Sequence, residues 1–346
     1  MNKTRILYWI LSGLLIVSCL VSVSIGSVSI EIKQIFSLIL NRMGFEGSQN
    51  FTTTQENVFW ILRFPRVLFG VLVGVALGIS GVSLQGIFRN PLVDSGLIGI
   101  ASGASLLASC FIVLSSYFSF LSIVNAQLTM AFVAFVGAAV TAFLVYRVSL
   151  YNGKINITML ILAGVALNAV SGSLTGLLTY FADDRQLRDI TFWTLGSLSG
   201  ATWLSLSILA FFVLIPAFIL MRYRNALNAF ALGEKSAYFI GVDTKRVKFV
   251  VLLCSTAMVG ATVAFSGIIG FVGLVIPHIL RLIIGPNHRA LMPLSALAGA
   301  LLICLADLVS RTLINPIEIP IGIITSIIGA PILLLIILKQ KRNLFV

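Results

Sequence analysis

Charged side chains are scarce in this sequence. Only 10% of its 346 residues are Asp, Glu, Lys or Arg, whereas soluble globular domains average about 25%. Hydrophobic residues make up 59% of the chain. A soluble globule of this size could not cover so much apolar surface, so the composition predicts a protein whose solvent is lipid.

Residues for covalent or metal chemistry are also few. There are only two histidines, and the four cysteines lie in apolar runs without Cys-x-x-Cys spacing: Cys19, Cys110, Cys254 and Cys304. This pattern argues against a disulfide framework and against a metal site. The chain has no paired carboxylates, no GxSxG or HExxH motif, and no GxxxxGK[ST] loop to bind ATP. We therefore expect no catalytic residue, no metal ligand and no covalently bound cofactor.

The sequence instead contains a series of apolar runs. Runs of about 20 residues can each span a bilayer as a helix, and they lie at 6–26, 64–86, 93–115, 126–147, 155–181, 203–221, 244–266, 291–313 and 321–338. A shorter tenth run, 269–285, is broken by Gly270, Gly273 and Pro277. The first run exceeds a signal-peptide core of about 7–15 residues, so we expect it to be retained. These runs predict an all-α integral membrane protein with ten transmembrane helices, in which residues 1–346 form one domain.

The basic residues favour one orientation of this chain. With the N-terminus inside, 16 of the 23 Lys and Arg residues fall in inner segments and seven in outer ones. Such an excess marks the cytoplasmic side, where anionic lipids attract it. The net charge of +12 therefore indicates contact with membrane lipid rather than with nucleic acid. Both termini and the loop 222–248 are predicted to be cytoplasmic. The loops 27–63 and 182–190 are predicted to be outside, with some helix near Ile30 to Leu40.

The loop 222–248 is the longest polar interruption among the apolar runs after residue 64, and it holds six of the basic residues. Apolar residues recur within it between Asn225 and Gly241, and Gly233 and Gly241 are helix breakers. This pattern predicts one or two short amphipathic helices on the cytoplasmic face, a surface that a soluble motor protein could bind. An ordinary solvated loop is the alternative interpretation.

Two interrupted segments, Ser80 to Ala104 and Ser266 to Ala290, both begin with Ser-Gly and contain a proline. The spans that precede them run in opposite directions, which favours an inverted internal repeat. Glycines spaced by four or eight residues, Gly70, Gly74 and Gly78 in the second span and Gly164, Gly172 and Gly176 in the fifth, predict tight helix packing. Asn168 fits either a packing hydrogen bond or a polar pathway.

Asp307 is the only acidic residue well inside a span, and it lies four residues before Arg311. Residues at this spacing face each other on a helix, so we predict a structural ion pair. A proton relay would normally use a second buried carboxylate. A proton-coupled secondary transporter is therefore disfavoured, although it and a non-transporting membrane scaffold are the alternatives from other classes.

Six motifs, in register from Arg63 onwards, carry a resemblance to a known family. They are RFPR at 63–66, SGVSLQGIFRNPL at 80–92, LGEKSAYFIGVD at 232–243, SGIIGFVGLVIPHILR at 266–281, NHR at 287–289 and IPIGIITSIIGAP at 319–331. They resemble the vitamin B12 and iron-chelate class of ABC importer permeases, the FecCD-type family. One departure is Asn287, where relatives usually have Asp, and we expect its effect to be small and local.

The resemblance implies a homodimeric permease in the bacterial inner membrane. Its expected partners are two cytoplasmic ATPase subunits, which would use the ATP, and a periplasmic or lipid-anchored binding protein. We expect the second, fifth and eighth spans to form the dimer interface.

The resemblance also implies roles for particular residues. The outer arginines Arg63, Arg66 and Arg311 are expected to dock the binding protein, and their position against the positive-inside bias supports a special role. The residues expected to couple the permease to the ATPase are Ala231, Leu232, Gly233, Glu234, Ala237 and Gly241. Candidates for the transport pathway are Gln85, Arg89, Asn90, Asn168 and Gly172.

The transported substrate is less constrained by the sequence. The segment 180–203 resembles haem permeases somewhat more than siderophore or cobalamin permeases. We therefore expect haem as the cargo, with ferric siderophore and cobalamin as the alternatives.

Overall fold

The computed structural model describes residues 3–45, 50–115, 126–152, 154–314 and 316–344. Within them, seven apolar helices are long enough to cross a membrane, and three shorter apolar helices accompany them. The ten helices are α1 (Lys3–Ser24), α4 (Phe64–Phe88), α5 (Ile100–Leu114), α6 (Ala126–Ser149), α7 (Ile157–Phe181), α9 (Trp203–Arg222), α12 (Thr244–Ser266), α13 (Val272–Ile284), α14 (His288–Thr312) and α15 (Ile321–Leu344). The ten predicted helices are thus present, and the all-α membrane fold is confirmed.

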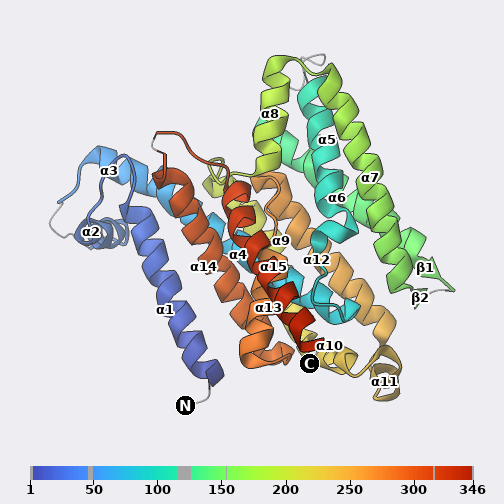
Figure 1. Ribbon diagram of the computed structural model, residues 1–346. Helices are drawn as coiled ribbons and strands as arrows, with labels where there is room; N and C mark the ends of the chain where they lie inside the picture. Colours follow the sequence, from blue (N-terminus) through green and yellow to red (C-terminus); the bar gives the residue numbers. More distant parts are fainter. Residues whose placement is uncertain (1–2, 46–49, 116–125, 153, 315, 345–346) are drawn as a thin grey trace.

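Smaller elements occupy the two ends of this bundle. They are α2 (Ile32–Arg42), α3 (Thr53–Asn57), the π-helix η1 (Val58–Arg63), the 3₁₀-helix η2 (Ser95–Ile98), α8 (Asp184–Leu195), α10 (Arg224–Ala231), α11 (Glu234–Phe239), and the two-residue strands β1 (Leu150–Tyr151) and β2 (Lys154–Ile155). Figure 1 shows the start of α1 and the end of α15 at the same end as α10 and α11, with α3 and α8 at the other. The helix expected near Ile30 to Leu40 is α2, and the loop 222–248 forms two short helices as predicted.

Helix α4 lies at the centre of the subunit. A Cβ atom placed on Gly74 would collide with the backbone of Gly299 and Ala300 on α14, and one on Gly78 would collide with Ser295. Such close approach of backbones holds helices together in lipid, where apolar burial gives no net driving force. The packing role predicted for the second-span glycines is confirmed. The expected place of this span at a dimer interface is wrong, because 78% of its apolar window is buried inside the subunit.

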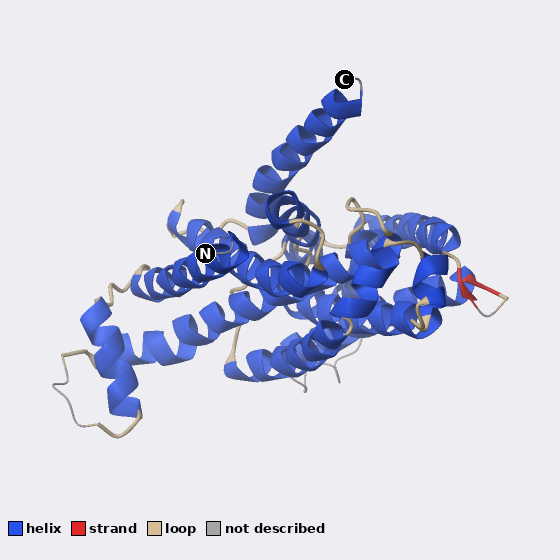
Figure 2. Cartoon of the chain, turned by 90° about the horizontal axis from the view of Figure 1, so that it is seen from below, coloured by secondary structure: helices blue, strands red, loops and turns tan. Residues whose placement is uncertain are grey.

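Helix α7 differs from α4 in having a bare face. Gly164 packs against the backbone of Leu97, as the packing hypothesis requires, whereas a Cβ on Gly172 or Gly176 would meet no described atom within 4 Å. Helix α15 leaves the bundle (Figure 2), and its Ile327 is 67% exposed. Both helices therefore present apolar surface that the described part of this chain does not cover.

The two interrupted segments break at different points relative to their Ser-Gly pairs. Helix α4 continues through Ser80 and Gly81 to Phe88, and the chain is irregular until η2 and α5 begin. Helix α12 ends at Ser266, and Gly267 adopts a φ of 69°. The span expected at 93–115 is consequently α-helical only from Ile100, because Gly99, with a φ of 82°, separates the 3₁₀-helix η2 from α5. The inverted repeat remains a prediction.

The topology can be tested by cysteine labelling in a background without the four native cysteines. Position 48, in the outer loop, lies outside the described residues, so we choose the exposed Thr54 of α3 and the exposed Lys235 of α11. We expect Thr54→Cys to react with a membrane-impermeant maleimide from outside the cell. Lys235→Cys should react only in inverted vesicles. Reaction of both positions from the same side would contradict the ten-span topology.

Candidate functional site

The cytoplasmic loop forms two helices because glycines end them. Gly233, with a φ of 108°, separates α10 from α11, and Gly241, with a φ of 89°, follows α11. Residues other than glycine adopt such angles only with strain. The Asp243 side chain then accepts a hydrogen bond from the Arg246 backbone at 3.1 Å and caps α12. The breakers identified in the sequence therefore determine where each helix ends.

Large apolar side chains on this loop face away from the protein. The exposed fractions are 70% for Leu232, 67% for Tyr238, 83% for Phe239 and 63% for Ile240. Ala237 is fully buried and anchors α11 to the bundle. We call these four exposed residues the coupling patch. Because apolar clusters outside the spans are costly in water, such a patch is typical of a surface that contacts another protein or the membrane.

A buried lysine fastens α11 to the bundle. Lys248, only 3% exposed, donates from Nζ to Glu234 Oε1 at 2.6 Å and to the carbonyl of Ile155 on β2 at 3.0 Å. Only the lysine is buried, because the Glu234 side chain is 39% exposed, so removing Glu234 would leave the Lys248 charge without its ionic partner, at a cost in stability. From the sequence we expected a role for Glu234 but not for Lys248, although the place of Lys248 one turn into an apolar span was a usable signal.

Side chains also connect α10 to the start of α14. Asn228 Oδ1 accepts from the His288 backbone at 2.8 Å, and Asn228 Nδ2 donates to Asn287 Oδ1 at 3.0 Å. Arg289 Nε donates to Asn225 Oδ1 at 2.8 Å. Asn287 Oδ1 also accepts from the Arg289 backbone at 3.0 Å, and an aspartate oxygen could accept the same two bonds. Displacement of α10 would therefore be transmitted to α14.

At the opposite end of the bundle, two of the predicted docking arginines cap helix α1. Arg63 Nη1 donates to the carbonyls of Val23 at 2.7 Å and Ser24 at 3.0 Å. Arg311 Nη2 donates to the carbonyl of Ser22 at 2.6 Å. The last carbonyls of a helix lack partners within it and carry partial negative charge, so arginine suits them well.

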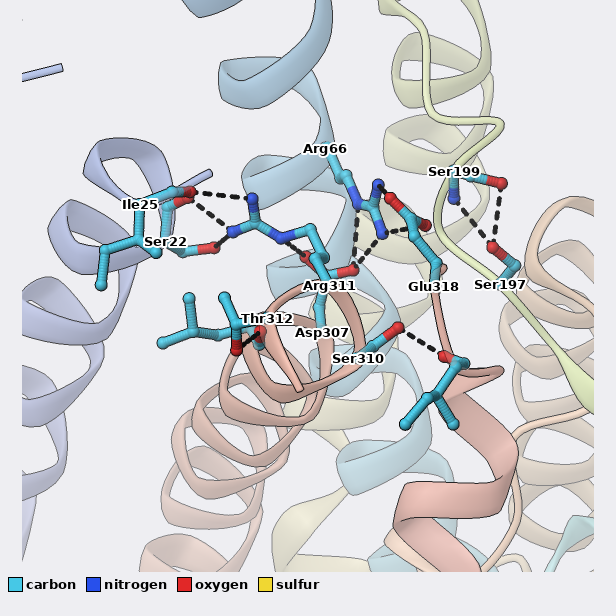
Figure 3. Close-up of polar contacts among 12 residues, drawn as sticks. Ser22, Ile25, Arg66, Ser197, Ser199, Asp307, Ser310, Arg311, Thr312 and Glu318 are labelled. Atoms are coloured by element: carbon cyan, nitrogen blue, oxygen red, sulfur yellow. Dashed lines mark hydrogen bonds and ion pairs between the residues drawn. The ribbon is translucent and has the colours of Figure 1, made fainter. Parts of the chain in front are cut away.

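The third arginine, Arg66, joins three segments of the chain (Figure 3). Its Nη1 and Nη2 donate to Oε1 and Oε2 of Glu318 at 2.8 and 2.9 Å, and Nη2 lies 2.8 Å from Asp307 Oδ1. Asp307 Oδ2 lies 3.2 Å from Arg311 Nε, which confirms the predicted i,i+4 ion pair. We call Arg66, Asp307, Arg311 and Glu318 the outer ionic cluster. Asp307 is thus shared by two arginines, one of which comes from another helix.

Three of the four side chains in the outer ionic cluster are largely buried, which limits the access of a binding partner to them. Side-chain exposure is 4% for Asp307, 10% for Arg311, 13% for Arg66 and 40% for Glu318. The hydrogen bonds from Arg66 lower the pKa of Glu318, opposed by its partial burial. A lowered pKa means that Glu318 stabilises the cluster above its unfolded-state pKa, and that this contribution is lost as the pH falls through the folded-state pKa. All three arginines are bonded within the chain, and their docking role remains a prediction.

Two of the pathway candidates make hydrogen bonds inside the subunit. Gln85 is buried on α4 and donates from Nε2 to the carbonyl of Leu274 on α13 at 3.2 Å. Asn168 accepts from Ser102 Oγ at 2.5 Å and donates to the carbonyl of Gly96 at 2.9 Å. Of the two roles open to Asn168, the structure shows the packing hydrogen bond.

The other three candidates are exposed. Arg89 ends α4 with a φ of 51°, and its Nη1 lies 3.7 Å from the Cβ position of Gly233. Asn90 Oδ1 accepts from the Leu92 backbone at 2.9 Å, and Gly172 lies on the bare face of α7. The structure thus does not bring the five candidates together at one site, and their role in transport remains a prediction.

Comparison with known proteins agrees with this architecture. Residues 14–339 match the model of the FecCD transport family. The hemin transport system permease of Yersinia pestis is 38% identical over 99% of this chain and 98% of its own. The cobalamin import permease of Halobacterium salinarum is 37% identical over 83% and 75%, and the molybdate import permease of Haemophilus influenzae is 36% identical over 96% and 95%.

A solved structure extends the likeness to three dimensions. It is described as a metal-chelate type ABC transporter in an inward-facing conformation, and it superimposes with a TM-score of 0.83 at 33% identity, covering 97% of this chain and 99% of that one. The ten helices, the two-helix loop and the match along nearly the whole chain confirm the predicted class. This multi-pass membrane protein is a permease subunit of the ABC importer type and belongs to the FecCD transport family.

Proposed function

We propose that this permease imports an iron chelate, with haem as the first candidate, as a homodimer driven by two partner ATPase subunits. The near full-length likeness to a hemin permease supports haem. Cobalamin and molybdate permeases are almost equally similar in sequence. Sequence identity over the whole chain therefore distinguishes only weakly between these cargoes. Ferric siderophore and cobalamin therefore remain the alternative cargoes.

The coupling patch is the observation that carries this proposal. Four large apolar side chains stand outside the apolar spans, on α11 and in the turns on either side of it. Lys248 and the asparagines of α10 hold this loop against the bundle. Such a surface suits a soluble partner that pushes on the loop, and the bonds from α10 to α14 provide a route for the movement. If the loop 222–248 only connected two spans, it would need neither the exposed apolar side chains nor the buried hydrogen bonds of Lys248.

The outer ionic cluster is evidence against the alternative function, a proton-coupled secondary transporter. Asp307 accepts from both Arg66 and Arg311, so protonating it would break two ion pairs in a site with little water. A proton carrier must gain and lose its proton in every cycle. We therefore keep ATP as the energy source, used by the partner subunits.

The bare faces of α7 and α15 support a second copy of this chain as the partner in the membrane. Gly172 and Gly176 provide room for close approach of another backbone. In this arrangement the cargo would pass between the two copies. We therefore propose the fifth and tenth spans for the interface, in place of the second, fifth and eighth spans expected from the sequence.

Uptake into proteoliposomes tests the cargo directly. The purified permease is reconstituted with its ATPase and binding protein, and haem, a ferric siderophore, cobalamin and molybdate are compared. We expect ATP-dependent uptake of haem above the other three. Uptake of another cargo alone would reject the haem assignment and leave the ATP-driven mechanism standing. Uptake driven by a pH gradient without ATP would reject that mechanism.

A proline at Gly233 tests the coupling role. Proline fixes φ near −65°, whereas Gly233 requires 108°, so Gly233→Pro should distort the turn and abolish ATP-driven uptake while the binding protein still docks. Gly44 on the outer loop has a similar φ of 86° and an open Cβ position. Gly44→Pro is therefore the matched control and should retain uptake. Normal uptake by a well-expressed Gly233→Pro variant would show that the loop is only a tether.

Docking of the binding protein would require Arg66 to exchange partners. Its fork is occupied by Glu318, the most exposed member of the outer ionic cluster, and a carboxylate of the binding protein could take the same two bonds. We therefore propose that Glu318 is an internal competitor for the docking site. Arg63 and Arg311 are held by backbone carbonyls of α1 and would contribute mainly positive potential.

Two substitutions separate these roles in a binding assay with the purified binding protein. Losing one side of a desolvated ion pair costs roughly 2–5 kcal/mol, so Arg66→Glu should weaken docking at least about tenfold. Glu318→Gln should strengthen it, because Arg66 loses its internal carboxylate. The exposed Glu31→Gln variant is the control. Unchanged affinity in an Arg63→Glu, Arg66→Glu, Arg311→Glu triple variant that folds correctly would reject the docking role.

A further inference from the structure

A cavity lies between α2, α3, η1 and the start of α9, and it shares no lining residue with the coupling patch or the outer ionic cluster. Its volume is about 460 Å³, and it is lined by Arg42, Glu56, Asn57, Trp60, Ile61 and Trp203. Small-molecule sites typically measure about 300–1,000 Å³. The cavity is thus large enough for a polar headgroup of a lipid or for a small metabolite.

Trp60 and Trp203 form one wall of the cavity and are held in place by their contacts. Trp203 Nε1 donates to the carbonyl of Trp60 at 2.8 Å, which ties the start of α9 to η1. The Phe64 ring lies 5.3 Å from Trp60 and 5.9 Å from Trp203, centre to centre. The indole N–H of Trp60 has no hydrogen-bond partner among the described residues. Tryptophan is enriched where membrane meets water, because its ring is apolar and its N–H is polar.

The cavity also carries one charge of each sign. The Arg42 guanidinium lies 5.9 Å from the centre of the Trp60 ring. Among the described residues, neither Arg42 nor Glu56 belongs to any ion pair. Opposite charges that share a cavity without neutralising each other suit a ligand that itself carries both charges. Arginine is well suited to phosphate and a carboxylate to ammonium.

The surroundings of the cavity indicate contact with lipid rather than open water. On α2, Ile32, Phe36 and Leu40 recur every four residues and are 53%, 55% and 47% exposed, whereas Ile35 and Leu38 on the other face are buried. An amphipathic helix with such an apolar face lies in the plane of the membrane interface. Ile61 lines the cavity and is itself 59% exposed. A ligand in the cavity would therefore have an apolar path beside it.

We propose that this cavity binds the headgroup of a zwitterionic phospholipid that carries a phosphate and a primary ammonium group. Arg42 holds the phosphate, Glu56 accepts hydrogen bonds from the ammonium group, and the acyl chains run along Ile61 and the lipid-facing side of η1. A free zwitterion in water fits the two charges equally well but leaves the apolar rim without a partner. The proposal does not depend on which cargo the permease carries.

Lipid retention by the purified full-length protein tests this site. The protein is delipidated and titrated with phosphatidylethanolamine or phosphatidylglycerol, and bound lipid is counted by native mass spectrometry. We expect phosphatidylethanolamine to bind more tightly. Since hydrogen bonds to charged groups contribute about 1.5–3 kcal/mol, Arg42→Gln should weaken its binding about tenfold or more. Glu56→Gln should remove the preference for phosphatidylethanolamine, because phosphatidylglycerol has a phosphate but no ammonium group.

Two further variants keep the outcome interpretable. Lys33→Gln removes an exposed charge from the same helix outside the cavity and should leave lipid binding unchanged. Arg42→Lys keeps the positive charge and should bind more lipid than Arg42→Gln, with thermal unfolding confirming that both are folded. Equal binding of the two lipids by the unsubstituted protein, or full binding by Arg42→Gln, would overturn the proposal. If these variants instead lose affinity for the binding protein with lipid binding unchanged, the cavity belongs to a protein-docking surface.

Discussion

The close approach of α4 and α14 is the contact on which the rest of this structure depends. In lipid, apolar side chains gain nothing by facing one another, so helices associate through backbone proximity at small residues. Gly74 and Gly78 on α4 meet the backbone of α14 around Gly299. Each end of α14 then carries one set of polar contacts, the bonds to α10 at its start and the Asp307–Arg311 pair at its end. A shift of α4 and α14 would therefore change contacts at both ends of the bundle.

Charges near the membrane are held by partners that the fold supplies. A charged side chain inside the bilayer is costly unless it is paired or reaches water. Arg66 and Arg311 share Asp307, Arg63 binds the end of α1, and Lys248 binds Glu234 together with a backbone carbonyl. These pairs are structural in this state of the protein. A partner that bonded to Arg66 would therefore have to displace an internal carboxylate, and Glu318 is the one more exposed to water.

The coupling patch differs from these charged groups, because its apolar side chains are mostly exposed and, within the described chain, only the rings of Tyr238 and Phe239 contact each other. Glycines with positive φ set its shape, and buried bonds fasten it to α12 and α14. A rigid attachment beneath an unsatisfied apolar surface is what a mechanical contact between subunits requires. The same reasoning applies to the bare faces of α7 and α15, where a second copy of the chain would supply the missing contacts.

Local patterns in the sequence determined the spans, the two-helix loop, the glycine breakers and the Asp307–Arg311 pair. Each depends on residues no more than one or two helical turns apart, where hydropathy and spacing suffice. Only the tertiary structure decided that the second span is central, that Asn168 bonds to Gly96, that Arg66 is held by Glu318, and that Arg42 and Glu56 share a cavity. These features join segments far apart in the chain. Which helices become neighbours depends on the packing of all ten, and no local pattern encodes it.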